Sequence, residues 1–253
     1  MRDTVLRHYE AKYASDAREG DAEPLVVPTG APGDRFEACV SDLPRRLAGG
    51  DVLEIAAGSG RLAQSLLSAG LRCESYTATE LSQARLAALH RTLRDPRVRV
   101  APLDLEAPAQ GDTARYDAII LLALIEHLVD PLRAMARVRG WLRPGGFAFV
   151  DTPNIAKWTR RAKLLGGIFP ATASRDEGLV TYEGQPVDLH DEGHLHYFTY
   201  RSLTQMLTRR CGFSRVERVP YASAPYILGR RGSYALARLA PTAFSEIALV
   251  AYT

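Results

Sequence analysis

A short glycine-containing segment is the first part of the sequence whose residues suit ligand binding. The chain reads DVLEIAAGSG over residues 51–60, an apolar run followed by two glycines, Gly58 and Gly60. A turn built on glycine lets a ligand approach the backbone, because no Cβ atom stands in the way. The spacing up to Ala63 also fits the dinucleotide fingerprint, in which an acidic residue about 20 positions further on binds a ribose diol. Glu80 occupies that place, so the segment predicts an adenosine-containing ligand without deciding which one.

Glu54 narrows the choice of ligand. It lies four positions before Gly58, inside the expected strand, and so brings a carboxylate next to the glycine turn. A carboxylate there repels a pyrophosphate and attracts an ammonium group. The residue type therefore favours a ligand with an ammonium group over a dinucleotide. The structural alternative is that Glu54 caps the helix beginning near Ser59.

Alternating apolar and amphipathic stretches position this turn. Strands are predicted over residues 51–55, 73–79, 97–101, 116–123 and 147–152. Helices are predicted over residues 34–47, 61–69, 82–93 and 130–142. Strands that alternate with helices are typical of a doubly wound parallel sheet, an α/β fold that binds ligands at the carboxyl ends of its strands. Beyond this alternation, helices are predicted over 201–210 and 225–239, and strands over 213–219 and 246–252.

The composition is that of an ordinary globular protein. The chain has 253 residues, 46% of them hydrophobic and 24% charged, and its three cysteines lack metal-ligand spacing. No apolar run reaches the roughly 20 residues of a membrane helix, and the polar N-terminus is unlike a signal peptide. The net charge of +3 is spread along the chain, which argues against a nucleic-acid partner. We therefore expect a cytoplasmic protein, a monomer or homodimer, that binds neither nucleic acid nor membrane.

In combination, the motifs resemble those of the class I S-adenosylmethionine-dependent methyltransferases. VLEIAAGSG is similar to that family's first motif, usually VLEIGCGTG, with Ala56-Ala57 where Gly-Cys is commoner. The stretch IEHLVDPLRAMARVRGWLRPGGFAFVDTPN (125–154) resembles the family's segment from the fourth to the fifth strand. HLHYFTYRSLTQMLTRRCGF (194–213) resembles the H-x-x-x-F-T…L…GF segment of a subgroup that acts in ubiquinone biosynthesis and on sugars. The resemblance covers residues 35–253.

The resemblance implies a Rossmann-like sheet of seven strands, mostly parallel with an antiparallel last strand, and helices on both faces. It implies S-adenosylmethionine as cofactor and S-adenosylhomocysteine as product, with Glu80 on the ribose and Asp104 on the adenine. The cofactor-binding residues that it implies are Glu54, Ala56, Gly58, Gly60, Glu80, Leu81, Asp104, Leu105 and Leu122. We expect residues 1–34 to form an N-terminal helix or lid and a loop. Residues 35–253 then form the catalytic domain, with 153–197 as a substrate-binding insertion or lid.

Two histidines are candidates for the chemistry at the methyl group. Transfer from a sulfonium to a hydroxyl needs alignment and removal of the hydroxyl proton, a task that suits histidine. His127 lies just beyond the fourth strand, and His194 begins the segment that leads back to the sheet. For His127 the alternative is a structural role at the start of the next helix. A metal site of His190, His194 and His196 fits the residue types, but all three lie in one loop with no second ligand group evident, so we expect no metal.

The sequence narrows the chemical class of the methyl acceptor by excluding one kind of substrate. Residues 121–125 lack the Asn/Asp-Pro-Pro-aromatic run with which methyltransferases of bases or glutamine bind a planar NH₂ group. Trp158 and Tyr197 are the expected contacts for a small organic acceptor, and Tyr9 and Tyr13 are candidates to close over the site. We predict methyl transfer to a hydroxyl, or second to an amine, of a sugar, phenol or natural-product intermediate. The alternatives are a non-catalytic regulatory partner that binds S-adenosylmethionine, and a nicotinamide dehydrogenase.

Overall fold

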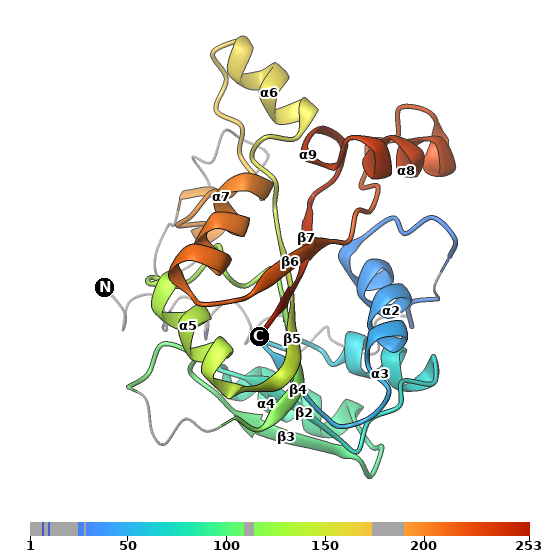
Figure 1. Cartoon of the computed structure of the whole chain (residues 1–253), viewed down its shortest axis with the longest axis vertical. Coiled ribbons are helices and arrows are strands. Elements are labelled where there is room, and N and C mark those ends of the chain that lie inside the picture. The colour runs from blue at the N-terminus through green and yellow to red at the C-terminus, as the bar shows by residue number, and fades with distance from the viewer. Residues whose placement is uncertain (1–6, 8–9, 11–24, 28, 109–113, 174–189) are drawn as a thin grey trace.

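A seven-stranded sheet forms the centre of the computed structural model (Figure 1). The structure describes residues 7, 10, 25–27, 29–108, 114–173 and 190–253. The strands are β1 (Asp51–Ile55), β2 (Ser75–Glu80), β3 (Val98–Pro102), β4 (Tyr116–Leu122), β5 (Leu142–Thr152), β6 (Arg215–Arg218) and β7 (Ile247–Tyr252). Their order is β3-β2-β1-β4-β5-β7-β6. The pairs from β3 to β5 are parallel, whereas β7 runs antiparallel to both β5 and β6. The predicted α/β class and the antiparallel last strand are confirmed.

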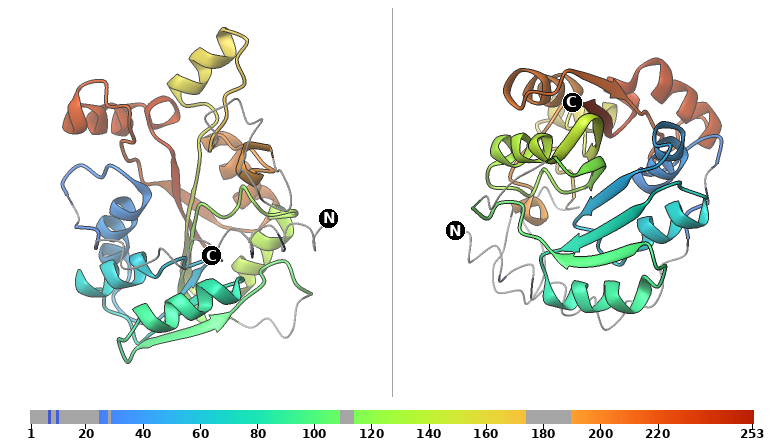
Figure 2. Two further views of the ribbon diagram at one scale, coloured as in Figure 1. Left: turned by 180° about the vertical axis from the view of Figure 1, so that it is seen from behind. Right: turned by 60° about the horizontal axis from the view of Figure 1, so that its bottom comes forward.

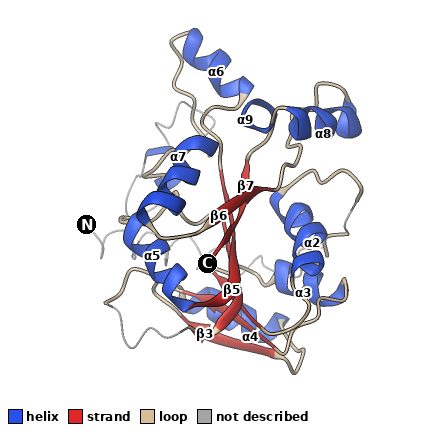
Figure 3. Cartoon of the chain, in the orientation of Figure 1, coloured by secondary structure: helices blue, strands red, loops and turns tan. Residues whose placement is uncertain are grey.

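Helices cover both faces of the sheet, as Figures 1 and 3 show. They are α2 (Arg35–Arg46), α3 (Arg61–Ser68), α4 (Gln83–Thr92), α5 (Pro131–Trp141), α6 (Trp158–Leu165), α7 (Tyr200–Gln205), α8 (Gly229–Leu239) and α9 (Pro241–Phe244). A 3-10 turn (His190–Gly193) precedes α7, and a π-helical turn (Met206–Arg210) continues it. Helices α2, α3 and α4 contribute buried side chains to one apolar core, and α5 and α7 to a second. Figure 2 shows the helices on the two faces of the sheet from other sides.

Local sequence signals explain where two of these helices begin. The hydroxyl of Ser82 accepts a hydrogen bond from the backbone N–H of Arg85 at the start of α4. At the start of α5, a carboxylate oxygen of Asp130 accepts the N–H of Arg133 at 3.0 Å, and Pro131 occupies the first turn. Proline suits that position because its missing N–H has no partner within the helix. Ser82 and Asp130 thus cap the helices that the sequence predicted over 82–93 and 130–142.

The fifth strand is longer than predicted. The sequence predicted its start at residue 147, after the glycines, but β5 begins at Leu142, which pairs with Tyr116. Gly146 makes this pairing possible because a Cβ atom on it would lie 2.9 Å from the carbonyl oxygen of Asp117. A glycine between the predicted helix and the predicted strand therefore allows two strands to come together.

The described part of the N-terminal segment lies beside α4. Arg7 and Glu10 are helical, and the Glu10 carboxylate accepts hydrogen bonds from the Ser82 hydroxyl at 3.0 Å and from the next backbone N–H at 3.1 Å. Tyr9 and Tyr13 lie outside the described residues, so their predicted closure over the site stays a prediction. No helix within the described ranges is both long and apolar enough to cross a membrane.

Candidate functional site

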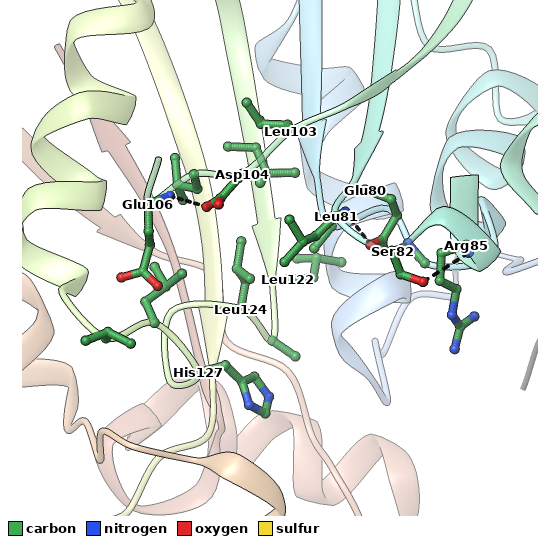
Figure 4. Close-up of a pocket in the computed structure, with 17 residues that line it drawn as sticks. Glu80, Leu81, Ser82, Arg85, Leu103, Asp104, Glu106, Leu122, Leu124 and His127 are labelled. Carbon is green, nitrogen blue, oxygen red and sulfur yellow. Dashed lines mark hydrogen bonds between the residues drawn. The ribbon is translucent and has the colours of Figure 1, made fainter. Parts of the chain in front are cut away.

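A cavity of about 280 Å³ lies at the carboxyl ends of β1, β2, β3 and β4. Seven of the nine predicted cofactor residues line it: Ala56, Gly58, Glu80, Leu81, Asp104, Leu105 and Leu122. In Figure 4 the Glu80 and Asp104 side chains lie on either side of Leu122, and His127 lies at a third edge. Glu54 lines a second cavity of about 190 Å³, which shares part of its lining with the first.

The turn after β1 depends on an unusual backbone conformation and on Glu80. Ala56 and Gly58 have φ values of 58° and 60°, in the left-handed region that costs a residue with a Cβ atom about 1–2 kcal/mol. One Glu80 oxygen accepts the N–H of Gly58 at 2.8 Å, and the other accepts the N–H of Leu81 at 3.0 Å. Burial raises the pKa of Glu80, although these two hydrogen bonds oppose the shift. The same carboxylate therefore holds the turn and lines the cavity.

Gly60 has a packing role. It lines neither cavity, and its φ is 85°. A Cβ atom on Gly60 would lie 3.1 Å from the side chains of Leu89 and Leu93, next to α4. Glycine thus lets the start of α3 approach α4 closely, and its predicted contact with a cofactor stays a prediction.

Charged side chains of both signs surround the second cavity. Glu54 is buried and accepts a hydrogen bond from the Tyr76 hydroxyl at 2.6 Å, and burial raises its pKa to about 8. Helix α3 has no side-chain cap, so the alternative role for Glu54 as that cap is wrong. Arg35, Arg61 and Arg85 line the same cavity. A carboxyl opposite guanidinium groups suits a zwitterion, with partners for both its ammonium and its carboxylate. These arginines were not predicted from the sequence, although each lies in the first turn of a helix that begins at this edge.

The turn after β4 and the loop before α7 meet at His127. Backbone N–H groups of residues 195–196 donate to the carbonyl oxygen of Glu126 at 2.8 and 3.1 Å. His127 Nδ1 lies 3.1 Å from the carbonyl oxygen of Gly193. The rings of His127 and His194 lie 4.6 Å apart, edge to face. The two predicted catalytic histidines are therefore neighbours, and His127 lines the main cavity.

A buried hydrogen-bond chain holds His194. Its Nδ1 lies 2.5 Å from the Thr172 hydroxyl, which donates to an Asp191 carboxylate oxygen at 2.7 Å. Asp191 is fully buried and also accepts the backbone N–H groups of Thr172 and Ala173. Burial lowers the pKa of His194 to about 4, so the ring is neutral at pH 7. Asp191 and Glu192 have φ values of 48° and 58°, a strained backbone of the kind found at functional sites.

Two buried carboxyl groups that were not predicted from the sequence, Glu126 and Asp151, lie nearby. One Glu126 oxygen accepts the Thr152 hydroxyl at 2.9 Å, and the other has no hydrogen-bond partner among the described residues. Burial raises the pKa of Glu126 to about 7. Asp151 accepts the Tyr221 hydroxyl at 2.7 Å and lies 3.7 Å from Arg35 Nε, and burial raises its pKa to about 6. The available signals were the position of Glu126 beside His127 and that of Asp151 near the end of β5.

The predicted acceptor contacts lie away from the main cavity. Trp158 begins α6, and neither it nor Tyr197 lines either of the two cavities. The Tyr197 hydroxyl donates to Asp191 at 3.2 Å. Phe169 packs against Tyr197 and does not line the main cavity either. Residues 174–189, part of the same predicted insertion, lie outside the described residues, so contact of this segment with an acceptor stays a prediction.

Comparison with known proteins identifies relatives of the chain. Residues 33–217 match the family model described as a methyltransferase domain. The chain is 30% identical over 115 residues to the ubiquinone biosynthesis O-methyltransferase of Nitrosospira multiformis, a match to 45% of this chain and 47% of that protein. It is 28% identical over 160 residues to the protein of the same name from Alkalilimnicola ehrlichii, covering 60% and 62%. The chain thus spans only part of the length of the curated relatives it matches.

Solved structures share the fold at low sequence identity. The DhpI–SAH complex superposes with a TM-score of 0.61 at 16% identity, covering 98% of this chain and 97% of that one. An S-adenosylmethionine-dependent methyltransferase from Mesorhizobium loti superposes with a TM-score of 0.58 at 15% identity, covering 87% and 99%. These likenesses support the Rossmann-like architecture that the strand order indicates.

Proposed function

Because the chain belongs to the family of methyltransferase domains, we propose that it transfers the methyl group of S-adenosylmethionine to a hydroxyl group of a small organic molecule. The observation that carries the proposal is the cavity that joins two strand-end carboxylates, Glu80 and Asp104, to the imidazole of His127. The carboxylates suit an adenosine, and the imidazole suits the group that receives the methyl. The O-methyltransferase names of the curated relatives support a hydroxyl acceptor.

The residues of the two cavities bind the methyl donor in this proposal. Glu80 accepts hydrogen bonds from the ribose hydroxyls and Asp104 from the adenine amino group, while Leu122 contributes apolar contact. The second cavity takes the amino-acid end of the donor. There Glu54 faces the ammonium group and Arg35 the carboxylate, as the charges of that cavity favour.

The reaction forms a carbon–oxygen bond while the carbon–sulfur bond breaks and leaves its electron pair on sulfur. Because the sulfonium is already a good leaving group, alignment of the reacting atoms supplies much of the acceleration. The acceptor hydroxyl must also lose its proton. Glu126, His127 and His194, all beside the end of β4, are the groups that activate this hydroxyl.

Calorimetric titration tests the donor site first. We expect micromolar affinity for S-adenosylmethionine and S-adenosylhomocysteine and no binding of NAD. Glu80→Ala should weaken the binding of both, whereas Glu74→Ala, which removes an exposed carboxylate, should not. Binding of NAD in preference to the other two would favour the dehydrogenase alternative and overturn the proposal.

Turnover tests the acceptor class. Release of S-adenosylhomocysteine is measured with panels of phenols, sugars and amines of similar size. Turnover with phenols or sugars supports the proposal, and turnover with amines alone replaces the hydroxyl by an amine. Tight donor binding without turnover on any panel member would favour the regulatory alternative.

A further inference from the structure

We propose that Glu126, His127 and His194 bind a divalent metal ion of the zinc class. One ligand atom from each residue lies within 4.8 Å of the other two, and this is the one such group of metal-ligating side chains in the described ranges. The ligands come from both segments, the turn after β4 and the loop before α7. His190, His194 and His196, the candidates expected from the sequence, lie in one loop, whereas this group draws its ligands from two segments.

The hydrogen bond of His127 leaves its second nitrogen as a ligand atom. Nδ1 lies 3.1 Å from the carbonyl oxygen of Gly193. A carbonyl only accepts hydrogen bonds, so in the neutral ring the hydrogen is on Nδ1 and the lone pair is on Nε2. Metal-binding histidines usually donate their other N–H to a carbonyl or carboxylate in this manner. The bond therefore fixes both the tautomer and the ring orientation that a metal ion requires.

His194 is oriented in the same way through Thr172. The Thr172 hydroxyl has one hydrogen and lies within hydrogen-bond distance of His194 Nδ1 and of an Asp191 oxygen. Because the Asp191 carboxylate only accepts, it takes the hydroxyl hydrogen, and Nδ1 of His194 donates to the hydroxyl oxygen. The lone pair of His194 is then on Nε2. Asp191 acts as the buried carboxylate that commonly supports a metal-binding histidine through its outer hydrogen bonds.

Glu126 supplies the charge that this arrangement needs. Its side chain is 1% exposed, and one of its oxygens has no hydrogen-bond partner in the described part of the chain. A buried carboxylate oxygen without a partner is costly, and burial raises the pKa of Glu126 accordingly. One nitrogen of each imidazole lies within 4.8 Å of a Glu126 carboxylate oxygen. An ionised carboxylate and two neutral imidazoles each offer an electron pair, so a cation is the ligand that suits these three groups together.

The donor set indicates the class of ion. Two imidazole nitrogens and one carboxylate oxygen suit zinc and neighbouring transition metals better than magnesium or calcium, which prefer oxygen ligands. Zinc at about 2.1 Å from each ligand holds the ligand atoms roughly 3.4 Å apart. The three ligand atoms lie within 4.8 Å of one another, so side-chain movements of up to about 1 Å bring them to that separation. Three protein ligands leave coordination positions open. His127 also lines the main cavity, so the ion lies at the edge of the proposed acceptor site.

The role of the ion rests on the proposed function, whereas its binding does not. An acceptor hydroxyl bound to the ion has a lowered pKa, since the positive charge stabilises the alkoxide or phenolate. Its proton passes to solvent water as the oxygen binds the ion. The oxygen then receives the methyl group, and sulfur keeps the electron pair of the broken carbon–sulfur bond.

Metal titration of the purified full chain tests the site without any methyl donor. The protein is stripped with EDTA and titrated with Zn²⁺ by calorimetry and with Co²⁺ by visible absorption. We expect one equivalent of either ion, with the intense visible bands of low-coordinate Co²⁺. Glu126→Gln, His127→Ala and His194→Ala should each weaken binding at least tenfold. Thr172→Val should weaken it about tenfold or more by releasing His194.

Matched controls separate this site from chance binding. His190→Ala and His196→Ala remove histidines of the same loop that do not belong to the group, and they should leave Zn²⁺ affinity unchanged. Donor binding by each variant reports that it is folded. Zn²⁺ affinity that survives Glu126→Gln and His194→Ala, or that is lost with His196→Ala, overturns the proposal. The proposed function fails separately, through absent donor binding, so the two failures are distinguishable.

Discussion

Binding of the methyl donor should release a proton from Glu54. This carboxyl is buried, and its pKa is about 8, with desolvation as the largest cause and the charge of Glu80 as a further one. At pH 7 a group with this pKa is protonated in about nine of ten molecules. An ammonium group beside it favours the ionised form, because the two opposite charges attract within a site of low dielectric constant. Between pH 6 and 7, donor affinity should therefore rise close to tenfold per pH unit.

Calorimetry in two buffers measures this proton directly. The heats of titration at pH 7 in phosphate and in Tris differ by the number of protons released multiplied by the difference between the ionisation enthalpies of the two buffers, and we expect about 0.9 proton. Glu54→Gln should bind the donor more weakly at pH 7.5, with an affinity nearly independent of pH. Tyr76→Phe is the matched control, because it removes the hydrogen bond to Glu54 and keeps the carboxyl. Its proton release should persist. Tight donor binding by the native protein without proton release would refute the assignment of Glu54 to the ammonium group.

Three further predictions concern single residues. Ala56→Gly should raise the free energy of unfolding by up to about 1 kcal/mol, because it relieves a φ of 58°, whereas Ala57→Gly should not; chemical denaturation compares the two. Glu80→Ala should weaken donor binding by about 1–3 kcal/mol in calorimetry, the cost of losing a charge-assisted hydrogen bond, with Glu74→Ala unchanged. The folded state binds the Asp151 proton more tightly than the unfolded state does, so the native protein should lose stability as the pH rises from about 4 to 6. Asp151→Asn should remove this loss. Melting temperatures that fall equally in both proteins over that range would show that Asp151 is not responsible.

The donor side of the site could be predicted from the sequence for a physical reason. Carboxyl ends of parallel strands meet at one edge of a sheet, so a residue at the end of a predicted strand has a known place. Glu80 at the end of β2 and Asp104 just beyond β3 follow this rule, and both line the main cavity. Ala56 shows its limit. The sequence marked that alanine as a departure from the usual glycine, but only the structure gives the left-handed φ that explains why glycine is common there.

The part of the site around His127 and His194 could be predicted from the sequence only in part. An irregular loop before α7 brings His194 next to Glu126, and its shape depends on buried hydrogen bonds and on two residues with positive φ, Asp191 and Glu192. No periodicity in the sequence encodes such a loop, because its backbone partners are single groups far away in the chain. His127 was predicted from its place after β4, yet its neighbour Glu126 was not. A glutamate at that position is an ordinary surface residue until the loop covers it.

The buried carboxyl groups give the site one common electrostatic property. Glu54, Glu126 and Asp151 lie at or beside the two cavities, and burial raises the pKa of each to between about 6 and 8. In the empty protein at neutral pH they therefore hold protons to differing extents in place of other cations. A ligand with an ammonium or sulfonium group, or a metal ion, replaces those protons and recovers the attraction that desolvation opposes. Donor binding and proton release should accordingly be coupled, so raising the pH from 6 to 7 should strengthen donor binding and lower the free energy of unfolding of the protein without donor.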